Sequence, residues 1–176
     1  MSGHNKFSKI KHQKAKNDAQ KSKVFGKLVR FISVEAKKSK GDTKSPGLAL
    51  AIEKAKKENM PNDTIDRAIK KATTDNGATM ESIIYETYGP GGTAIIINVL
   101  TDNRNKAVQE IKHILSKHGL ELAQVGSACW AFEKTHDGWT SKNSISIDDK
   151  DIENLKKLVD ELEENDDVQD VFTNAE

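Results

Sequence analysis

The stretch Thr93-Ala-Ile-Ile-Ile-Asn-Val-Leu100 decides the fold of the C-terminal half of this 176-residue chain. Its nearly unbroken run of apolar, mostly β-branched residues is typical of a buried strand. Directly after it, Asp102 or Asn103 can cap a helix that Gly119 can end. The apolar positions of that helix recur at helical spacing: Ala107, Ile111, Ile114 and Leu115.

Before the buried strand, residues 83–88 predict another strand, and Gly89-Pro-Gly-Gly92 predicts the tight turn between the two. The four residues lack the Gly-Lys-Ser/Thr ending of a phosphate-binding loop. Further strands are predicted at 128–133, 144–147 and 168–173, with an acidic helix starting at Asp148 or Asp149. The order β-β-α-β-β-α-β predicts a ferredoxin-like α/β domain over 80–176, with helices on one face of a mixed sheet.

The N-terminal half has the period of helices. We expect a first helix from about Gln13 to Lys38, with Phe25, Leu28, Val29, Ile32 and Ala36 on its inner face. A second helix carries Leu48, Ala51, Ile52 and Ala55 and ends near Asn59-Met-Pro61. Asn62 or Asp63 can cap a third, with Ile65, Ala68, Ile69 and Ala72 inside. The sequence therefore predicts an α+β protein whose residues 1–76 form a basic three-helix bundle.

Charge is divided unevenly along the chain. Thirteen of the first 44 residues are Lys or Arg against three acids, a net of +10, whereas residues 148–176 hold three lysines and twelve acids, a net of −9. A basic end of this strength indicates an electrostatic partner, most simply the backbone of a nucleic acid. Lys9, Lys16, Lys23, Arg30 and Lys37 recur every seven residues and would form one stripe along the first helix, with Lys27 beside it. The alternative is a solvated face, although such faces usually mix charges of both signs.

Two further segments are candidates for binding a nucleic acid. Residues 3–12 form an irregular basic arm that contains His4, Lys6, Phe7, Lys9, Lys11 and His12. Its charges suit phosphates and the ring of Phe7 could stack on a base, but Phe7 and Ile10 could equally fasten the arm to the bundle. At 101–106, Arg104 and Lys106 stand at the start of a helix, where the helix dipole disfavours cations. An anionic ligand or simple solvent exposure would each explain them.

Other classes of function are not indicated. The histidines, the carboxylates and Cys129 have no spacing typical of a catalytic centre or a metal site, so we expect no enzyme, no metal and no cofactor. We expect Cys129 to be a small buried residue in a strand. No apolar run approaches the ~20 residues needed to cross a bilayer, the first residues lack the apolar core of a secretory signal, and a single cysteine suits a reducing compartment.

Several short motifs together resemble the YebC family, which is described as transcriptional regulators and translational activators. They are Gly3-His4 with Lys6-Phe7, Ile10-Lys11-His12, Asn59-Met-Pro61, Tyr88-Gly-Pro-Gly-Gly92, Leu100-Thr-Asp-Asn-Arg104, Ser116-Lys-His-Gly119 and Asp166-Asp-Val-Gln169. The family pattern has tryptophan where this chain has Phe7. Family members also carry a further α/β domain after Lys134, whereas here only residues 135–142 bridge the gap, so we expect a hairpin at 134–143 in place of a third domain.

The resemblance implies a non-enzymatic factor in the cytoplasm, or in mitochondria for a processed eukaryotic form. It implies a nucleic-acid partner, and no membrane or small-molecule substrate. We expect RNA on the ribosome as the target, because the arm joins a ring to basic residues and no helix-turn-helix recognition helix is evident. A DNA-binding transcriptional regulator is the alternative, and an adaptor whose acidic helix meets a basic protein is a third possibility.

Overall fold

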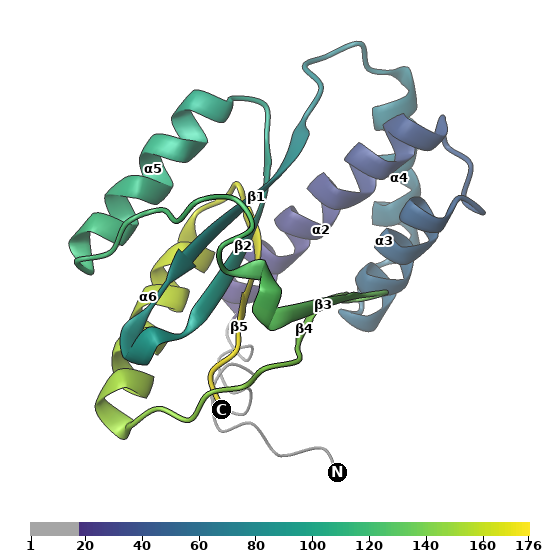
Figure 1. Ribbon diagram of the computed structural model, residues 1–176. Coiled ribbons are helices and arrows are strands. Elements are labelled where there is room, and N and C mark those ends of the chain that lie inside the picture. Colours follow the sequence, from purple (N-terminus) through teal and green to yellow (C-terminus); the bar gives the residue numbers. More distant parts are fainter. Residues whose placement is uncertain (1–17) are drawn as a thin grey trace. The chain divides into compact units, whose positions relative to one another are not determined.

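A computed structural model describes residues 18–176 of the chain (Figure 1). The described residues divide into two compact units, a helical unit up to Met80 and an α+β unit from Glu81 to Glu176. The chain as a whole is of the α+β class. Within residues 18–176, none of the helices combines the length and the apolar character that crossing a bilayer requires.

Three helices build the helical unit: α2 (Asp18–Ser39), α3 (Pro46–Lys57) and α4 (Asn62–Thr74). They share one apolar core, because every inner position predicted for the three helices is a buried or partly buried member of the same cluster. Ile32 and Ala36 of α2 meet Leu48, Ala51 and Ala55 of α3 there, and α4 adds Ile65 and Ala68. The helical period of the sequence therefore identifies the core-facing side of each helix.

The C-terminal ends of α2 and α3 have the same backbone motif. After α2, Gly41 N–H bonds to the carbonyl of Ala36 (2.8 Å) and Lys40 N–H bonds to that of Lys37 (3.4 Å). After α3, Met60 N–H bonds to the carbonyl of Ala55 and Asn59 N–H bonds to that of Lys56, both at 3.0 Å. These paired bonds form a Schellman motif, in which the residue after the helix adopts a left-handed conformation; Lys40 (φ 51°) and Asn59 (φ 59°) hold that place.

The start of α4 differs from its prediction. Pro61 is the N-cap residue and no side chain caps the helix, so Asn62 and Asp63 belong to its first turn instead of preceding it. The buried Met60 lies just before this proline, and Ile65 of the same helix end belongs to the same apolar cluster. The motif Asn59-Met-Pro61 thus ends one helix, places one core side chain and starts the next helix, which is a structural role.

The α+β unit is built on a three-stranded sheet in the order β1-β2-β5, formed by β1 (Glu81–Tyr88), β2 (Ala94–Thr101) and β5 (Val168–Thr173). Both pairs of strands are antiparallel, so the prediction of a mixed, ferredoxin-like sheet is wrong for this sheet. Strand 128–133 was expected to pair within the sheet, but it forms the 3-10 turn η2 (Cys129–Ala131) and the start of a separate hairpin. Residues 144–147 contribute only an isolated parallel bridge, Ile145 to Ala175. With these two segments outside the sheet, β5 pairs directly with β2.

The sheet is covered on both faces (Figure 1). Helices α5 (Arg104–Lys117) and α6 (Asp149–Glu164) pack on one face against Ile95, Ile97 and Val99 of β2. On the other face, η2 and the hairpin of β3 (Phe132–Thr135) and β4 (Gly138–Ser141) enclose Ala94 and Ile96. Strand β2 is therefore buried on both sides, which explains its continuous apolar sequence.

The turn between β1 and β2 is a hairpin loop, as the sequence predicts. Gly89 N–H bonds to the carbonyl of Thr93 (2.8 Å), and η1 (Pro90–Gly92) forms the three-residue tip. Gly91 has φ 68°, and a Cβ there would lie 2.5 Å from Cγ2 of Ile147. Both the conformation and the close approach of Ile147 therefore demand glycine at this position.

Candidate nucleic-acid interface

The predicted interface falls into three groups of residues, and the first lies outside the described part of the chain. These residues are His4, Lys6, Phe7, Lys9, Lys11, His12 and Lys16. The second group is on α2 in the helical unit, and the third is on α5 in the α+β unit.

On α2, Lys23, Lys27, Arg30 and Lys37 fall within an arc of roughly 80° at 100° per residue. They therefore share one face, as the seven-residue spacing predicts, and all four are partly buried. Val34 lies in the middle of the same arc; it is only 7% exposed and stands outside the apolar core of the helical unit. The face is thus not the open, fully solvated surface that the alternative interpretation requires.

The cations of this face are already engaged within the chain. Lys23, Lys27 and Arg30 each interact with another group of the chain, and Lys37 Nζ donates a hydrogen bond of 2.8 Å to the carbonyl of Gly77. An external phosphate would therefore have to compete with, or add to, contacts that each side chain makes. Sequence spacing could not reveal this, because Gly77 is 40 residues away from Lys37.

The cations at the start of α5 have acidic partners. Arg104 donates from Nη2 and Nε to Glu81 at 3.1 and 3.3 Å, and this hydrogen-bonded pairing raises the pKa of the Arg104 guanidinium. Lys106 lies 3.8 Å from Glu110, one helical turn along α5. Both cations stay more than half exposed, but these pairs explain their position at a helix start without an anionic ligand.

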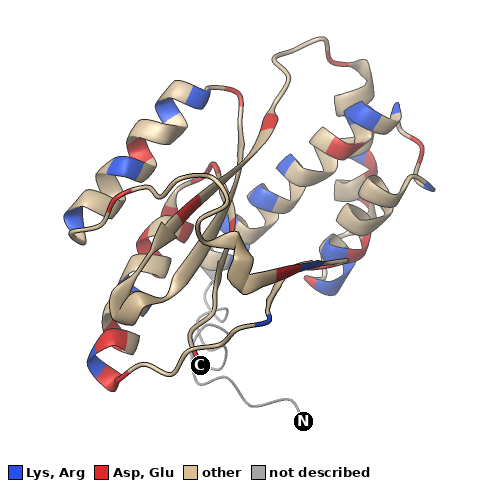
Figure 2. Cartoon of the chain, viewed as in Figure 1, with Lys and Arg blue, Asp and Glu red and all other residues tan. Residues whose placement is uncertain are grey.

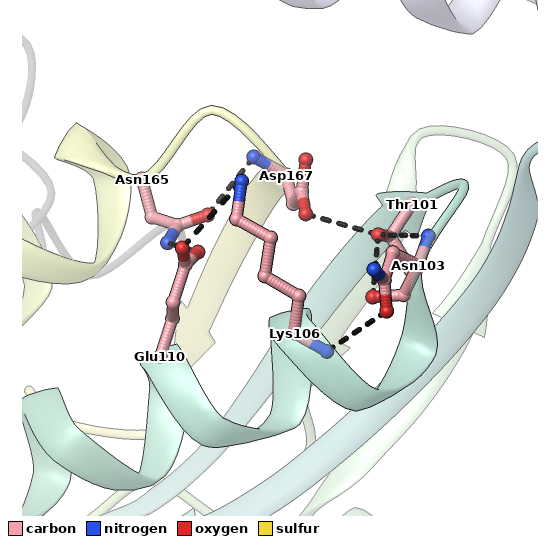
Figure 3. A network of polar contacts seen from close by, with 6 residues as sticks. All are labelled: Thr101, Asn103, Lys106, Glu110, Asn165 and Asp167. Carbon is pink, nitrogen blue, oxygen red and sulfur yellow. Dashed lines mark hydrogen bonds and ion pairs between the residues drawn. The ribbon is translucent and has the colours of Figure 1, made fainter.

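The segment 101–106 belongs to a network that joins three elements (Figure 3). The Asn103 side chain caps α5 by accepting from Lys106 N–H, so of the two candidate caps it is Asn103 that acts. The Thr101 hydroxyl donates to Asp167 (3.0 Å), and Asn165 donates to Glu110 on α5 (2.8 Å). The two motifs Leu100–Arg104 and Asp166–Gln169 therefore meet here, and the network fastens the end of β2, the start of α5 and the turn before β5 together.

Sequence reasoning missed a buried carboxylate. Glu86 on β1 is 5% exposed and accepts hydrogen bonds from the backbone N–H groups of Gly126 (2.7 Å), Ala128 (2.7 Å) and Cys129 (3.0 Å). Burial by itself would raise the pKa of Glu86, but these donors outweigh it and the pKa is lowered. Glu86 thus remains ionised and holds the loop before β3 against the sheet.

The same loop carries exposed apolar side chains. Trp130 donates from Nε1 to the Tyr88 hydroxyl (3.0 Å), and this hydroxyl donates to the carbonyl of Ser127. Trp130 is 53% exposed, and Val125 at the loop tip is 95% exposed. Cys129 is not in a strand as expected; it lies in η2, partly buried, and burial together with the neighbouring Glu86 raises the pKa of its thiol.

Of the histidines in the segment 113–118, His118 ends α5 and is tied to α6. Its Nε2 lies 2.8 Å from Glu161, which also accepts from Lys117 Nζ at 2.5 Å. The hydrogen bonds from Lys117 and His118 lower the pKa of Glu161. Gly119 then adopts φ 69°, and a third Schellman motif ends the helix, which gives the motif Ser116–Gly119 a structural role too.

Comparison with known proteins places this two-unit architecture in a family. Residues 5–75 match the family model of the TACO1/YebC protein N-terminal domain. Residues 80–137 and 134–175 match the model of the TACO1/YebC second and third domain. Together the two models cover nearly the whole sequence.

Individual relatives agree with these matches. A "Probable transcriptional regulatory protein" of Petrotoga mobilis is 42% identical over 186 residues, which cover all of this chain and 71% of the relative. A protein of the same name from Fervidobacterium nodosum is 37% identical over 235 residues, covering 99% of this chain and 93% of the relative. The crystal structure of a conserved hypothetical protein from Aquifex aeolicus superimposes with a TM-score of 0.81 at 32% identity and 95% coverage of both chains.

The fold and these matches define an α+β protein with a basic helical unit and a separate unit built on an antiparallel sheet. The chain belongs to the TACO1/YebC family. Its match to the second and third domain is split into two segments that overlap at residues 134–137, which are the end of β3 and the turn of the β3–β4 hairpin.

Proposed function

We propose that this chain is a non-enzymatic nucleic-acid-binding regulator of gene expression, and that its main target is RNA on the ribosome. The division of charge between the two units carries the proposal. Residues 16–80 contain 15 Lys or Arg against eight acids, and residues 81–176 contain nine against 19. A phosphate backbone is attracted to the first unit and repelled by the second, so the helical unit is the one expected to bind it.

The partly buried cationic face of α2 supports a structured contact with the backbone. Lys23, Lys27 and Arg30 lie on one side of α2, and each already interacts with another group of the chain. The preference for RNA rests on the sequence of the N-terminal arm, where Phe7 stands among basic residues and could stack on an unpaired base.

Duplex DNA is the second candidate, and two observations favour it. Relatives that match over nearly the whole chain are named probable transcriptional regulatory proteins. In addition, α3 and α4 are joined by only four residues, 58–61, a length that also occurs in helix-turn-helix proteins. The charges on α4 are mixed, which weakens the case for α4 as a recognition helix.

One preparation of the full chain tests both candidates. Cosedimentation with ribosomes across a range of salt concentrations is compared with fluorescence-anisotropy titrations of duplex DNA at the same salt concentrations. Salt-sensitive ribosome binding that is tighter than binding to duplex DNA is the expected result. Tighter binding to duplex DNA selects the transcriptional alternative, and no binding to either overturns the proposal.

A further inference from the structure

The C-terminal ends of α2 and α4 lie side by side in the helical unit. A Cβ on Gly41, just after α2, would lie 3.1 Å from Cγ2 of Thr73 in the last turn of α4. The hydrogen bond from Lys37 to the carbonyl of Gly77 ties the same two ends together. Because α3 runs away from the end of α2 for 12 residues, its last turn lies about 16 Å further along its axis.

Six lysines gather at the joined ends and form what we call the lysine cluster: Lys37, Lys38, Lys40, Lys44, Lys70 and Lys71. Three acids stand among them, and each has a partner: Glu35 with Lys38, Asp42 with Lys44 N–H, and Asp75 with Gly77 N–H. The local net charge is thus +3 (6 − 3). Four of the lysines are exposed and have no side-chain partner among residues 18–176, namely Lys40, Lys44, Lys70 and Lys71. Figure 2 marks the Lys and Arg positions along the helices in blue.

Stabilisation of helix ends accounts for only part of the lysine cluster. The negative end of the helix dipole favours the lysines in the last turns of α2 and α4. Lys44, however, stands just before the N-terminus of α3, where the dipole disfavours a cation. Lys40 occupies the left-handed position of the Schellman motif after α2. The same position is held by Asn59 after α3 and by Gly119 after α5, and both residue types tolerate a left-handed conformation better than lysine. Two cations are therefore placed where the fold itself favours other residues.

We propose that the lysine cluster is a second phosphate-binding surface of the helical unit, which takes the sugar-phosphate backbone of the bound nucleic acid. The inference rests on the proposed function and adds a contact region that shares only Lys37 with the cationic face of α2. The ammonium groups of Lys40, Lys44, Lys70 and Lys71 are exposed and have no side-chain partner among residues 18–176, so these four can neutralise phosphates without breaking an ion pair among those residues. Neutralised phosphates release counterions, which makes each contact measurable as salt dependence.

Two double variants of the full chain test the inference. K70E/K71E reverses two lysines of the cluster near the C-terminal end of α4, and K56E/K57E reverses an adjacent pair in the last turn of α3, away from the cluster. The two variants change the net charge equally, and both replace adjacent lysines in the C-terminal half of a helix of the same unit. Binding of a 20-nucleotide single-stranded RNA and of a 20-base-pair DNA duplex is measured by fluorescence anisotropy at several salt concentrations.

In K70E/K71E we expect the slope of log affinity against log salt to fall by about 1.4 on the RNA and about 1.8 on the duplex, while K56E/K57E keeps a slope close to that of the wild type. A third variant, K40G, removes one charge and relieves a left-handed lysine, so it should weaken binding without lowering the melting temperature. If the two double variants have equal salt slopes, or if K40G binds as the wild type does, the lysine cluster does not contact the nucleic acid. The proposed function stands in that case. A wild type that binds neither probe overturns both.

Discussion

Glu86 carries a buried negative charge that backbone donors stabilise. Three backbone N–H groups of one loop satisfy its two oxygens, and the loop that they hold presents Trp130 and Val125 to solvent. A buried ion is tolerated only when such donors replace its water shell. The carboxylate therefore fixes an irregular loop, at least 40 residues further along the chain, against the sheet.

Replacing Glu86 with glutamine tests this role. The amide has one acceptor oxygen and turns an NH2 group toward backbone donors, so at least one buried N–H loses its partner. We expect Glu86→Gln to lower the free energy of unfolding by about 1–3 kcal/mol, measured by urea denaturation at pH 7. Glu133→Gln on the exposed side of β3 is the control and should change stability by less than about 0.5 kcal/mol. Equal stability of the two variants would contradict the role of Glu86.

The acid stability of the protein should depend on the same residue. Because the pKa of Glu86 is lowered in the folded state, its contribution is fully present above the unfolded pKa of about 4.3 and is lost as the pH falls through the folded value. The stability difference between wild type and Glu86→Gln should therefore shrink as the pH falls from 5 to 3. Urea denaturation at pH 5, 4 and 3 measures this difference, and a constant gap would show that ionisation of Glu86 is not its source.

Phe7 separates RNA from duplex DNA as the target, although it lies outside the described residues. If its ring stacks on an unpaired base, Phe7→Ala should cost about 1–3 kcal/mol in binding to single-stranded RNA. It should cost little with duplex DNA, whose bases are already stacked. Thermal stability is measured in parallel, because a ring that fastens the arm to the helical unit would lower the melting temperature and affect both ligands alike. Equal losses with an unchanged melting temperature would favour the transcriptional alternative.

At the scale of elements, α2 has two functions on opposite sides. One side supplies Ile32 and Ala36 to the core of the helical unit, and the other carries the cationic face around the buried Val34. The cationic side chains are partly buried and engaged, so their removal affects the protein as well as a ligand. Binding and stability must therefore be measured together for any variant of this face.

The double variant K23E/R30E should weaken binding to RNA and to duplex DNA by similar factors, whatever the nucleotide sequence. Each phosphate contact that is lost should flatten the slope of log affinity against log salt by roughly 0.7 to 0.9. K156E/K157E on the acidic helix α6 makes the same change in net charge and should leave the slope unchanged. If K23E/R30E also leaves the slope unchanged, the cationic face of α2 does not contact phosphates and has only a structural role.

Local sequence predicts the helices and the central strand because their periodicity is a local property. The inner faces of α2, α3 and α4 and the buried β2 follow from spacing alone. The partners of strands are not a local property, so spacing does not show that β5 pairs with β2. Of the predicted strand 128–133, residues 129–131 form η2 and β3 begins only at Phe132. In the same way, Glu81 is 23 residues from Arg104 and Glu86 is more than 40 residues from two of its three donors, so neither contact could be predicted.

At the scale of the whole molecule, the uneven distribution of charge predicts that the two units differ in their affinity for nucleic acids. A fragment of residues 1–76 should retain most of the affinity for nucleic acids, because it holds 19 of the 28 Lys and Arg residues. A fragment of residues 80–176, with a net charge of −10 (9 − 19), should fold but bind weakly. Circular dichroism and anisotropy titrations of the two fragments measure folding and affinity. Tight RNA binding by the fragment 80–176 would contradict this division.

The turn of the β3–β4 hairpin is a place where this fold can gain or lose a whole domain. Thr135 and Gly138 are paired across its turn, so the chain leaves and re-enters the α+β unit at almost the same place. The segments of the family model meet at this turn as well. A domain whose own ends lie close together can be added to or removed from such a turn with little loss of chain entropy and without disturbing the sheet. The turn is therefore a suitable insertion site: a fluorescent reporter or an affinity module inserted between His136 and Asp137 should leave both units folded.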